Sequence, residues 1–178
     1  MKTKKNSIYL LLSLAVIGIL TALDQWTKYL AVAHLKGQPD ILLIPGVLQL
    51  QYLENHGAAF GILQNQQWLF TALTLIFLAF ALFALYRIPK EKPFMITFWV
   101  LTVLTAGALG NFIDRLVQKY VVDFVYFSLI NFPIFNVADI YCTLSVAVFF
   151  ILILFVYKEE QLTCLYHSII PEKKKSQE

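Results

Sequence analysis

The sequence predicts an all-α membrane protein with four transmembrane helices and a small β-sheet or hairpin in its first outer loop. Of its 178 residues, 59% are hydrophobic and only 14% are charged, whereas a soluble domain is about half apolar and a quarter charged. The mean hydropathy is +0.69. The apolar residues gather in four stretches without charge, each about as long as a helix that crosses ~30 Å of hydrocarbon: residues 6–23, 68–86, 93–113 and 140–157.

Helices are therefore expected at about residues 8–30, 68–86, 93–113 and 136–157. They form one transmembrane domain over residues 1–158, followed by a cytoplasmic tail at 159–178. The N-terminal lysines and the first apolar run also resemble a secretory signal peptide. Because three more apolar stretches follow, and because the first run continues into Asp24 and Lys28, we expect an uncleaved first helix.

The distribution of charge predicts the orientation. Ten of the fourteen basic residues lie on the side that holds both termini, so the positive-inside rule puts both termini in the cytoplasm. The lysine-rich tail then indicates a solvated cytoplasmic end rather than a nucleic-acid site. Every aspartate falls on the opposite, outer side: Asp24, Asp40, Asp114, Asp123 and Asp139. Any chemistry that needs them belongs to the outer leaflet or the space beyond it.

The first outer loop, at about residues 33–67, contains the residues that predict β-structure. Apolar and polar residues alternate around Gln49 and Gln51, and Pro45-Gly46 marks a turn, which together predict a sheet or hairpin over residues 41–53. Its amphipathic run favours a position on the membrane surface. The segment Glu54-Asn-His-Gly-Ala-Ala-Phe-Gly61 follows, and its small residues permit close backbone approach. By itself it indicates no more than a tight turn into the second helix.

Carboxylates are the groups left to do chemistry. His34 and His56 lie on the outer side, but no serine elbow accompanies them, and no His-Glu-x-x-His metal motif is present. Cys142 and Cys164 are expected on opposite sides of the membrane and should not pair. An ionisable residue at membrane depth is costly, which makes it a functional candidate.

Three aspartates lie close together in the sequence, at 114, 123 and 139, and two of them, Asp123 and Asp139, have no adjacent cation. Asp123 lies between two pairs of apolar residues, so desolvation should raise its pKa. Asp139 follows Asn136 by three residues, and Asn136 is a good N-cap for a helix whose dipole favours a carboxylate in its first turn. Capping therefore accounts for Asp139 but leaves Asp123 unexplained.

Two further aspartates have structural explanations. Asp114 stands beside Arg115, so a structural ion pair is its expected role. Asp24 and Lys28 have i,i+4 spacing, which favours either a plain intrahelical ion pair or a part in shaping the site.

If Asp123 and Asp139 meet, they will share one proton, because two like charges close together in a low dielectric cannot both form. The ionised carboxylate can polarise a water towards a peptide carbonyl, and the protonated one can bond the carbonyl oxygen. Three asparagines could orient the substrate backbone: Asn55, Asn111 and Asn136. No metal or cofactor is required.

A proton-coupled transporter is the alternative function, although four helices are few for a transporter built from two repeats. A non-enzymatic membrane assembly factor is another alternative.

Five blocks match, in order, a known family: Asp24-Gln-Trp-Thr-Lys28, Asn55-His-Gly-Ala-Ala-Phe-Gly61, Gly110-Asn-Phe-Ile-Asp-Arg-Leu116, Val121-Val-Asp-Phe124 and Phe135-Asn-Val-Ala-Asp139. The chain resembles the bacterial prolipoprotein signal peptidases, also called type II or lipoprotein signal peptidases, over its full four-helix length. The tail after Lys158 falls outside the resemblance.

The resemblance implies an aspartyl endopeptidase of the cytoplasmic (inner) membrane, with its active site on the periplasmic side. It would remove the signal peptide from diacylglyceryl-modified prolipoproteins by cutting on the amino side of the lipidated cysteine. Asp123 and Asp139 take the catalytic roles. Substrate-binding or site-supporting roles go to Asn55, Gly57, Asn111, Arg115, Asn136, Asp24, Lys28 and Asp114. The implied partners are lipidated prolipoproteins, membrane lipid and the peptide antibiotic globomycin, with no nucleic acid and no cofactor.

Overall fold

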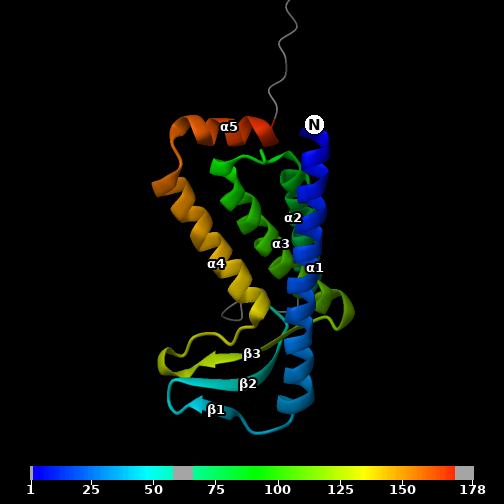
Figure 1. Cartoon of the computed structure of the whole chain (residues 1–178). Helices are drawn as coiled ribbons and strands as arrows, with labels where there is room; N and C mark the ends of the chain where they lie inside the picture. Colours follow the sequence, from blue (N-terminus) through cyan, green and yellow to red (C-terminus); the bar gives the residue numbers. More distant parts are fainter. Residues whose placement is uncertain (1, 58–65, 171–178) are drawn as a thin grey trace, which may run out of the picture.

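The computed structural model describes residues 2–57 and 66–170. Four long helices form a bundle with a small sheet at one end (Figure 1). The helices are α1 (Lys2–Leu35), α2 (Gln67–Arg87), α3 (Met95–Val117), α4 (Val137–Ile151) and a short α5 (Glu159–Ile169). The strands are β1 (Ile41–Ile44), β2 (Leu48–Asn55) and β3 (Val121–Phe127). A 3-10 turn precedes α3 (Lys92–Phe94), another follows β3 (Ser128–Ile130), and a π-helical turn extends α4 (Leu152–Val156).

The four expected membrane helices are present, and each is long and apolar enough to cross a bilayer. Two of them extend four or five residues beyond the predicted C-terminal end. The first runs on to Leu35 and ends only where Gly37 adopts a left-handed backbone (φ 72°). The third continues past residue 113 to Val117, because the polar residues near its end remain helical until Lys119 turns the chain at φ 66°.

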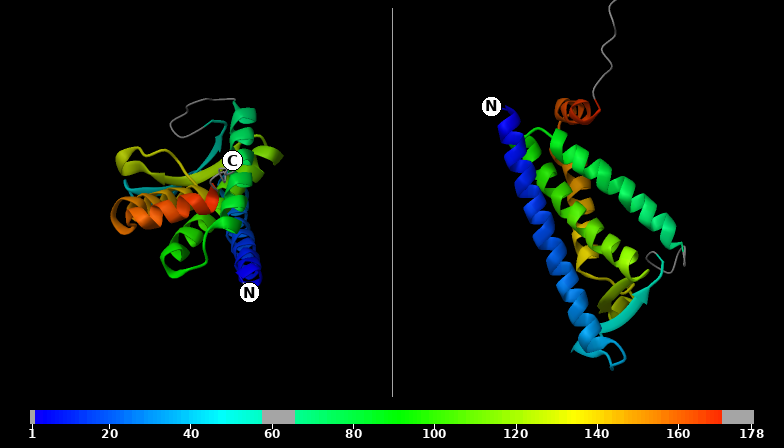
Figure 2. Two further views of the ribbon diagram at one scale, coloured as in Figure 1. Left: turned by 90° about the horizontal axis from the view of Figure 1, so that it is seen from above. Right: turned by 90° about the vertical axis from the view of Figure 1, so that its right-hand side faces the viewer.

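Helix α3 is the central helix of the bundle. It packs against α1, α2 and α4 and is the most buried of the four spans. Figure 2 shows α1 and α2 on opposite sides of α3. The core combines alanines, large aliphatic residues and phenylalanines, for example Ala84, Leu85 and Phe98. Large apolar side chains cover the outer surface of the bundle, as expected where the surrounding solvent is lipid.

The sheet has three antiparallel strands in the order β1-β2-β3. The predicted hairpin corresponds to β1 and β2, joined by a turn in which Gly46 has φ 72°. The third strand was not predicted, although the β-branched and aromatic residues of β3 are typical of strands. Its pairing with β2 sets Asn55 opposite Val121 and Leu53 opposite Asp123. A second apolar cluster, including Leu35, Val122 and Phe124, fixes β3 to the end of α1.

Helix α5 lies across the opposite end of the bundle, near the start of α1 (Figures 1 and 2). Its Leu165 is buried in the main core, and Arg87 Nε donates to Ser168 O at 2.7 Å. The last residues of α2 and the C-terminal helix are thus held together.

Lys90 closes the C-terminal end of α2. Its side chain is buried, and Nζ donates to Leu85 O and Ile88 O at 2.6 Å each. The ammonium also lies 4.5 Å from the centroid of the Phe98 ring. Burial lowers the pKa of Lys90 to about 8. Because the last carbonyls of a helix have no intrahelical donor, this cation satisfies groups that would otherwise be unpaired.

Lys90→Met is therefore expected to lower the stability of the protein by about 2–3 kcal/mol, the usual value of a hydrogen bond from a charged donor. For a chain of this size that corresponds to roughly 5–10 °C in the unfolding midpoint. Thermal unfolding in detergent measures it, with Lys92→Met at the neighbouring exposed lysine as the matched control. Equal midpoints for the two variants would contradict the capping role.

Candidate active site

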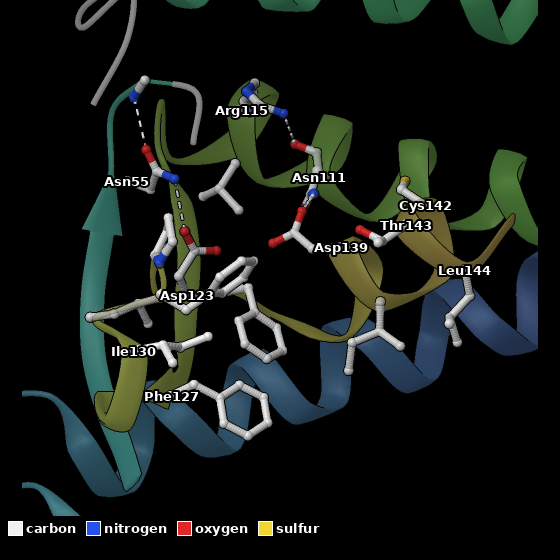
Figure 3. Close-up of a pocket in the computed structure, with 17 residues that line it drawn as sticks. Asn55, Asn111, Arg115, Asp123, Phe127, Ile130, Asp139, Cys142, Thr143 and Leu144 are labelled. Atoms are coloured by element: carbon white, nitrogen blue, oxygen red, sulfur yellow. Dashed lines mark hydrogen bonds between the residues drawn. The ribbon is translucent and has the colours of Figure 1, made fainter. Parts of the chain in front are cut away.

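Asp123 and Asp139 line the same pocket, whose volume is about 550 Å³. Asp123 is in the middle of β3, and Asp139 is in the first turn of α4. Figure 3 shows the two carboxyl groups pointing towards one another across the pocket. The chain folds this way because β3 runs along the sheet beneath the bundle, and the loop after it returns the chain to the bundle through hydrogen bonds between Val125 and Phe135.

Three asparagines hold the two aspartates. Asn55 Nδ2 donates to Asp123 Oδ2 at 2.8 Å, and Asn136 Nδ2 donates to Asp123 Oδ1 at 2.6 Å. Asn111 Nδ2 donates to Asp139 Oδ1 at 2.8 Å. These asparagines come from β2, α3 and the residue that precedes α4, so the sheet and the bundle both contribute residues that bind the pair.

Asp139 also closes a capping box. Its backbone N–H donates to Asn136 Oδ1 at 3.0 Å, and its Oδ2 accepts the Asn136 backbone N–H at 3.1 Å. The capping role expected from the sequence is confirmed. It coexists with a place in the pocket, because the second oxygen of Asp139 faces Asn111 rather than the helix.

The surroundings of Asp123 disfavour its ionised form. Burial, followed by the nearby Asp139 carboxylate, raises the pKa of Asp123 to about 7. The hydrogen bonds from Asn55 and Asn136 and the charge of Lys28 act in the opposite direction but are outweighed. A carboxyl group with this pKa can hold a proton near neutral pH and release it readily, as an acid–base group must.

A buried ion-pair cluster lies next to the pair. Lys28 Nζ is 2.9 Å from Asp24 Oδ2 and 2.9 Å from Asp114 Oδ2, and all three side chains are almost fully buried. The Asp24–Lys28 pair was expected from its spacing. Asp24 does more than pair, since its Oδ1 accepts the N–H of Ala138 at 2.9 Å and so holds the start of α4 against α1.

The expectation that Asp114 pairs with its neighbour Arg115 is wrong. Consecutive side chains of a helix point in different directions, so Asp114 faces Lys28 while Arg115 faces the pocket. Arg115 lies over the Phe70 ring at 5.1 Å, with one weak hydrogen bond to Asn111 O at 3.5 Å and a buried Nε that has no partner within the described ranges. A substrate carbonyl is the kind of group that could satisfy it.

Gly57 lies on the pocket wall, and its N–H donates to Asn55 Oδ1 at 3.0 Å. This bond orients the Asn55 amide so that its N–H groups face Asp123. The rest of that sequence block, Ala58–Gly61, lies outside the described residues.

Sequence reasoning missed one contact of the neighbouring ion-pair cluster and one feature of the pocket. Gln25 binds the ion-pair cluster, its Nε2 donating to Asp114 Oδ1 at 2.9 Å and to Gly110 O at 3.1 Å. Its position in the block with Asp24 was the available signal. The second is the apolar wall of the pocket, which no local pattern indicated: Phe127, Ile130, Phe132, Pro133, Ile134, Phe135, Ile140 and Leu144. Cys142, to which the sequence analysis gave no role, also lines the pocket.

Within the described part of the chain, no group of three histidine, cysteine or acidic residues is arranged to hold a metal ion. The polar groups of the pocket are the two aspartates, the amides and one guanidinium. Such a set can exchange protons and bind a peptide backbone.

Gly110 allows α1 and α3 to approach closely at the ion-pair cluster. A Cβ at this position would collide with the Asp24 carboxylate. Gly110→Ala is therefore expected to displace Asp24 from Lys28 and Ala138 and to lower stability by about 1–3 kcal/mol, the usual range for overpacking. Thermal unfolding tests this against Gly18→Ala, where a Cβ meets nothing within 4 Å. If the two variants unfolded at the same temperature, the close approach would not matter.

Comparisons with known proteins identify the family of the chain. The family model for signal peptidase (SPase) II, Peptidase A8, matches residues 16–155. The chain is similar to the lipoprotein signal peptidase of Streptococcus thermophilus, with 45% identity over 83% of this chain and 90% of that protein. It is also similar to the lipoprotein signal peptidase of Brevibacillus brevis, with 44% identity over 75% of this chain and 88% of that protein.

Solved structures of bacterial membrane enzymes have the same fold. One has a TM-score of 0.70 at 32% identity and covers 82% of this chain and 94% of its own. Another has a TM-score of 0.66 at 28% identity and covers 92% and 93%. The matched region includes both aspartates, the three asparagines and the ion-pair cluster. The chain belongs to the signal peptidase II family of aspartic peptidases and is a lipoprotein signal peptidase.

Proposed function

We propose that Asp123 and Asp139 are the catalytic pair and that they share one proton. The observation that carries the proposal is their position on facing walls of one pocket, with every oxygen of the two carboxyl groups accepting an N–H donor. Donors on all four oxygens hold both carboxyl groups in place. The side of each carboxyl group that faces the pocket stays available for water and substrate.

The environment assigns a different starting role to each aspartate. Asp139 lies at the N-terminus of α4, where the helix dipole and the N–H groups of Asn136 and Asn111 compensate a negative charge. Asp123, whose pKa is about 7, carries the proton at the start of the reaction. Asp139 then accepts a proton from a water molecule as that water attacks the scissile carbonyl carbon.

Asp123 donates its proton to the carbonyl oxygen as negative charge develops there, which gives a tetrahedral diol. When the diol collapses, Asp139 delivers its proton to the leaving nitrogen and Asp123 recovers its own from the diol hydroxyl. One water is consumed, one peptide bond is broken, and both carboxyl groups return to their first state. Asn55, Asn111, Asn136, Gly57 and Arg115 act by binding the backbone of the substrate or by holding the pair.

The substrate is a prolipoprotein that already carries its diacylglyceryl group, cut on the amino side of the lipidated cysteine. The apolar pocket wall and the exposed apolar residues of β1 and the loop after β3, such as Leu42, Leu129 and Ile130, support this proposal because acyl chains need an apolar path from the membrane. A cyclic peptide antibiotic such as globomycin would occupy the same pocket.

The catalytic domain spans residues 1–158 of a multi-pass protein of the bacterial cytoplasmic (inner) membrane. Its termini are on the cytoplasmic side and its active site on the periplasmic side, as supported by the asymmetry of basic residues. The sheet and the pair lie at the end of the bundle remote from the start of α1 (Figure 1), which fits this orientation.

A cleavage assay in detergent with matched precursors tests the proposed function. One precursor carries the diacylglyceryl cysteine and the other has the same sequence without lipid. We expect release of the signal peptide only from the lipidated precursor, with a new N-terminal cysteine that mass spectrometry identifies. Equal cleavage of both precursors would contradict the proposed substrate, and no cleavage of either would contradict the activity itself. A proton-coupled transporter would instead give flux in proteoliposomes.

The pH dependence of kcat tests the roles of the two aspartates. Since Asp123 must begin protonated and its pKa is about 7, kcat should be nearly constant below that pH and fall about tenfold per unit well above it. Single-turnover rates with the lipidated precursor between pH 5.5 and 9 measure this. A kcat that rises through pH 7 would mean that Asp123 is the base and would reverse the assignment.

A further inference from the structure

The catalytic scheme makes no use of Lys28, yet this lysine is buried beside the pair. Its Nζ has three N–H groups and contacts three acceptors: Asp24 Oδ2 at 2.9 Å, Asp114 Oδ2 at 2.9 Å and Asn111 Oδ1 at 2.8 Å. An ammonium donates and never accepts. The third contact is the one that reaches the active site, because Asn111 is a direct neighbour of Asp139.

An asparagine amide has an oxygen at one end and N–H groups at the other. In Asn111 the Oδ1 faces Lys28 and the Nδ2 faces Asp139. A flip of the amide would set its N–H groups against the ammonium, leaving two donors facing each other with no acceptor between them. Lys28 therefore admits only one orientation of Asn111, the one in which Asn111 donates to Asp139.

The orientation of the Asn111 amide also fixes the orientation of the Asn136 amide. Asn136 Nδ2 donates to Asn111 Oδ1 at 3.2 Å and to Asp123 Oδ1 at 2.6 Å. Its Oδ1 accepts the backbone N–H of Asp139 at 3.0 Å. Since the Asn111 oxygen is fixed by Lys28, the orientation of Asn136 follows, and both asparagines present N–H groups to the aspartates.

We infer that Lys28 is a positioning residue that fixes the Asn111 amide, so that Asn111 and Asn136 can only donate to the aspartates and the proton of the pair is directed into the pocket. The inference rests on the proposed function, because it explains how that pair is kept ready to react. It goes beyond a supporting ion pair, since an ion pair alone requires only Asp24 and Asp114.

Loss of Lys28 removes the constraint on the orientation of the Asn111 amide, and it also removes a positive charge. A flipped Asn111 would present its oxygen to Asp139 and draw the shared proton away from water and substrate. Lys28 is not on the pocket wall, so substrate binding should change little. The charged groups around Asp123 are Asp139 on α4, Arg115 and Asp114 on α3, and Lys28 with Asp24 on α1. Removing the Lys28 cation leaves the anions less compensated, which raises the pKa of Asp123.

The test is Lys28→Met, assayed with the lipidated precursor. We expect kcat to fall roughly 10- to 100-fold, as for a small misplacement of reacting groups, while KM changes less than about twofold. The alkaline limb of the kcat profile should move to higher pH by about half a unit or more. Gln25→Met is the matched control, because Gln25 belongs to the same buried cluster through Asp114 and Gly110 but has no hydrogen bond to Asn111. It should lower the unfolding temperature and leave the pH profile in place.

If Lys28→Met folds poorly, the double variant Lys28→Met/Asp114→Asn replaces it. It keeps the net charge of the cluster, so its alkaline limb should move less, but it also frees the Asn111 amide, so its kcat should still fall roughly 10- to 100-fold. An unchanged pH profile and kcat in the folded lysine variant, with only a lower unfolding temperature as in Gln25→Met, would overturn the inference.

The substitutions Asp123→Asn and Asp139→Asn distinguish a failure of the proposed function from a failure of the role of Lys28. If either keeps full kcat, the proposed function fails; if both are inactive while the lysine variant behaves like Gln25→Met, only the role of Lys28 fails.

Discussion

Asp123→Asn is expected to lower kcat by at least about 1,000-fold, within the range attributed to general acid–base catalysis, while the protein still folds. The substitution keeps the size of the side chain and removes the proton that the carbonyl oxygen needs. The measurement is release of the signal peptide from the lipidated precursor under single-turnover conditions, so that slow product release cannot hide the effect. Asp40→Asn, the same chemical change at an exposed position before β1, should leave kcat unchanged.

The difference in stability between Asp123→Asn and the wild-type protein should change with pH. The pKa of Asp123 is raised from 3.8 to about 7 in the folded protein. Its contribution to stability is therefore greatest below about pH 4 and is lost as the pH rises through 7. An asparagine is neutral at every pH, so the unfolding temperature of the variant, relative to wild type, should be higher at pH 8 than at pH 5. Full activity in a folded Asp123→Asn protein would exclude this residue from the catalytic pair.

Asp139→Asn is the second change with a large expected effect, again a loss of at least about 1,000-fold in kcat, because the base that receives the proton of water is gone. The amide retains one oxygen that can accept the Asn136 N–H, so the capping box is weakened rather than lost. We expect a cost of about 1 kcal/mol in stability, the usual value of such a cap. Thermal unfolding and single-turnover cleavage separate the two effects.

Asp139→Glu provides the control for position as distinct from charge. It keeps a titratable carboxyl group but moves it by one methylene away from Asn111 and Asn136. Its kcat should fall about 100-fold, as expected for a misplaced group, and should stay above that of Asp139→Asn. A kcat in Asp139→Asn equal to wild type, with the helix intact, would reduce Asp139 to the capping role that the sequence alone already explains.

The bundle was predictable because its signal is local. Four uncharged stretches of membrane-spanning length indicate four helices whatever their neighbours, and Asn136 marks the start of α4 by the chemistry of its own side chain. The hairpin of β1 and β2 was also readable from its alternation and its Pro-Gly turn. The third strand was overlooked because β3 lies among loop residues and is stabilised by pairing with a distant segment, β2.

The site was predictable only in part, since local sequence does not indicate which distant side chains meet. Asp123 was identified as an acid without an adjacent cation and subject to desolvation. It is buried and has no ion-pair partner among the described residues, but its immediate neighbours are two asparagines rather than apolar groups. The partner of Asp114 was misassigned because sequence adjacency is a poor guide to contact on a helix. The orientation of the asparagine amides depends on Lys28 on α1, which two helices separate from Asp139 on α4 in the chain. This contact can be recognised only when α1, α3 and α4 are packed together.

The central claim is that one proton is held by the facing aspartates near neutral pH, and a carboxyl titration followed by infrared difference spectroscopy measures it directly. In the wild-type protein, a band from a protonated carboxyl group should disappear as the pH is raised through about 7, and this band should be absent in Asp123→Asn. An identical titration in wild type and Asp123→Asn, or no carboxyl group that releases its proton near this pH, would contradict the account.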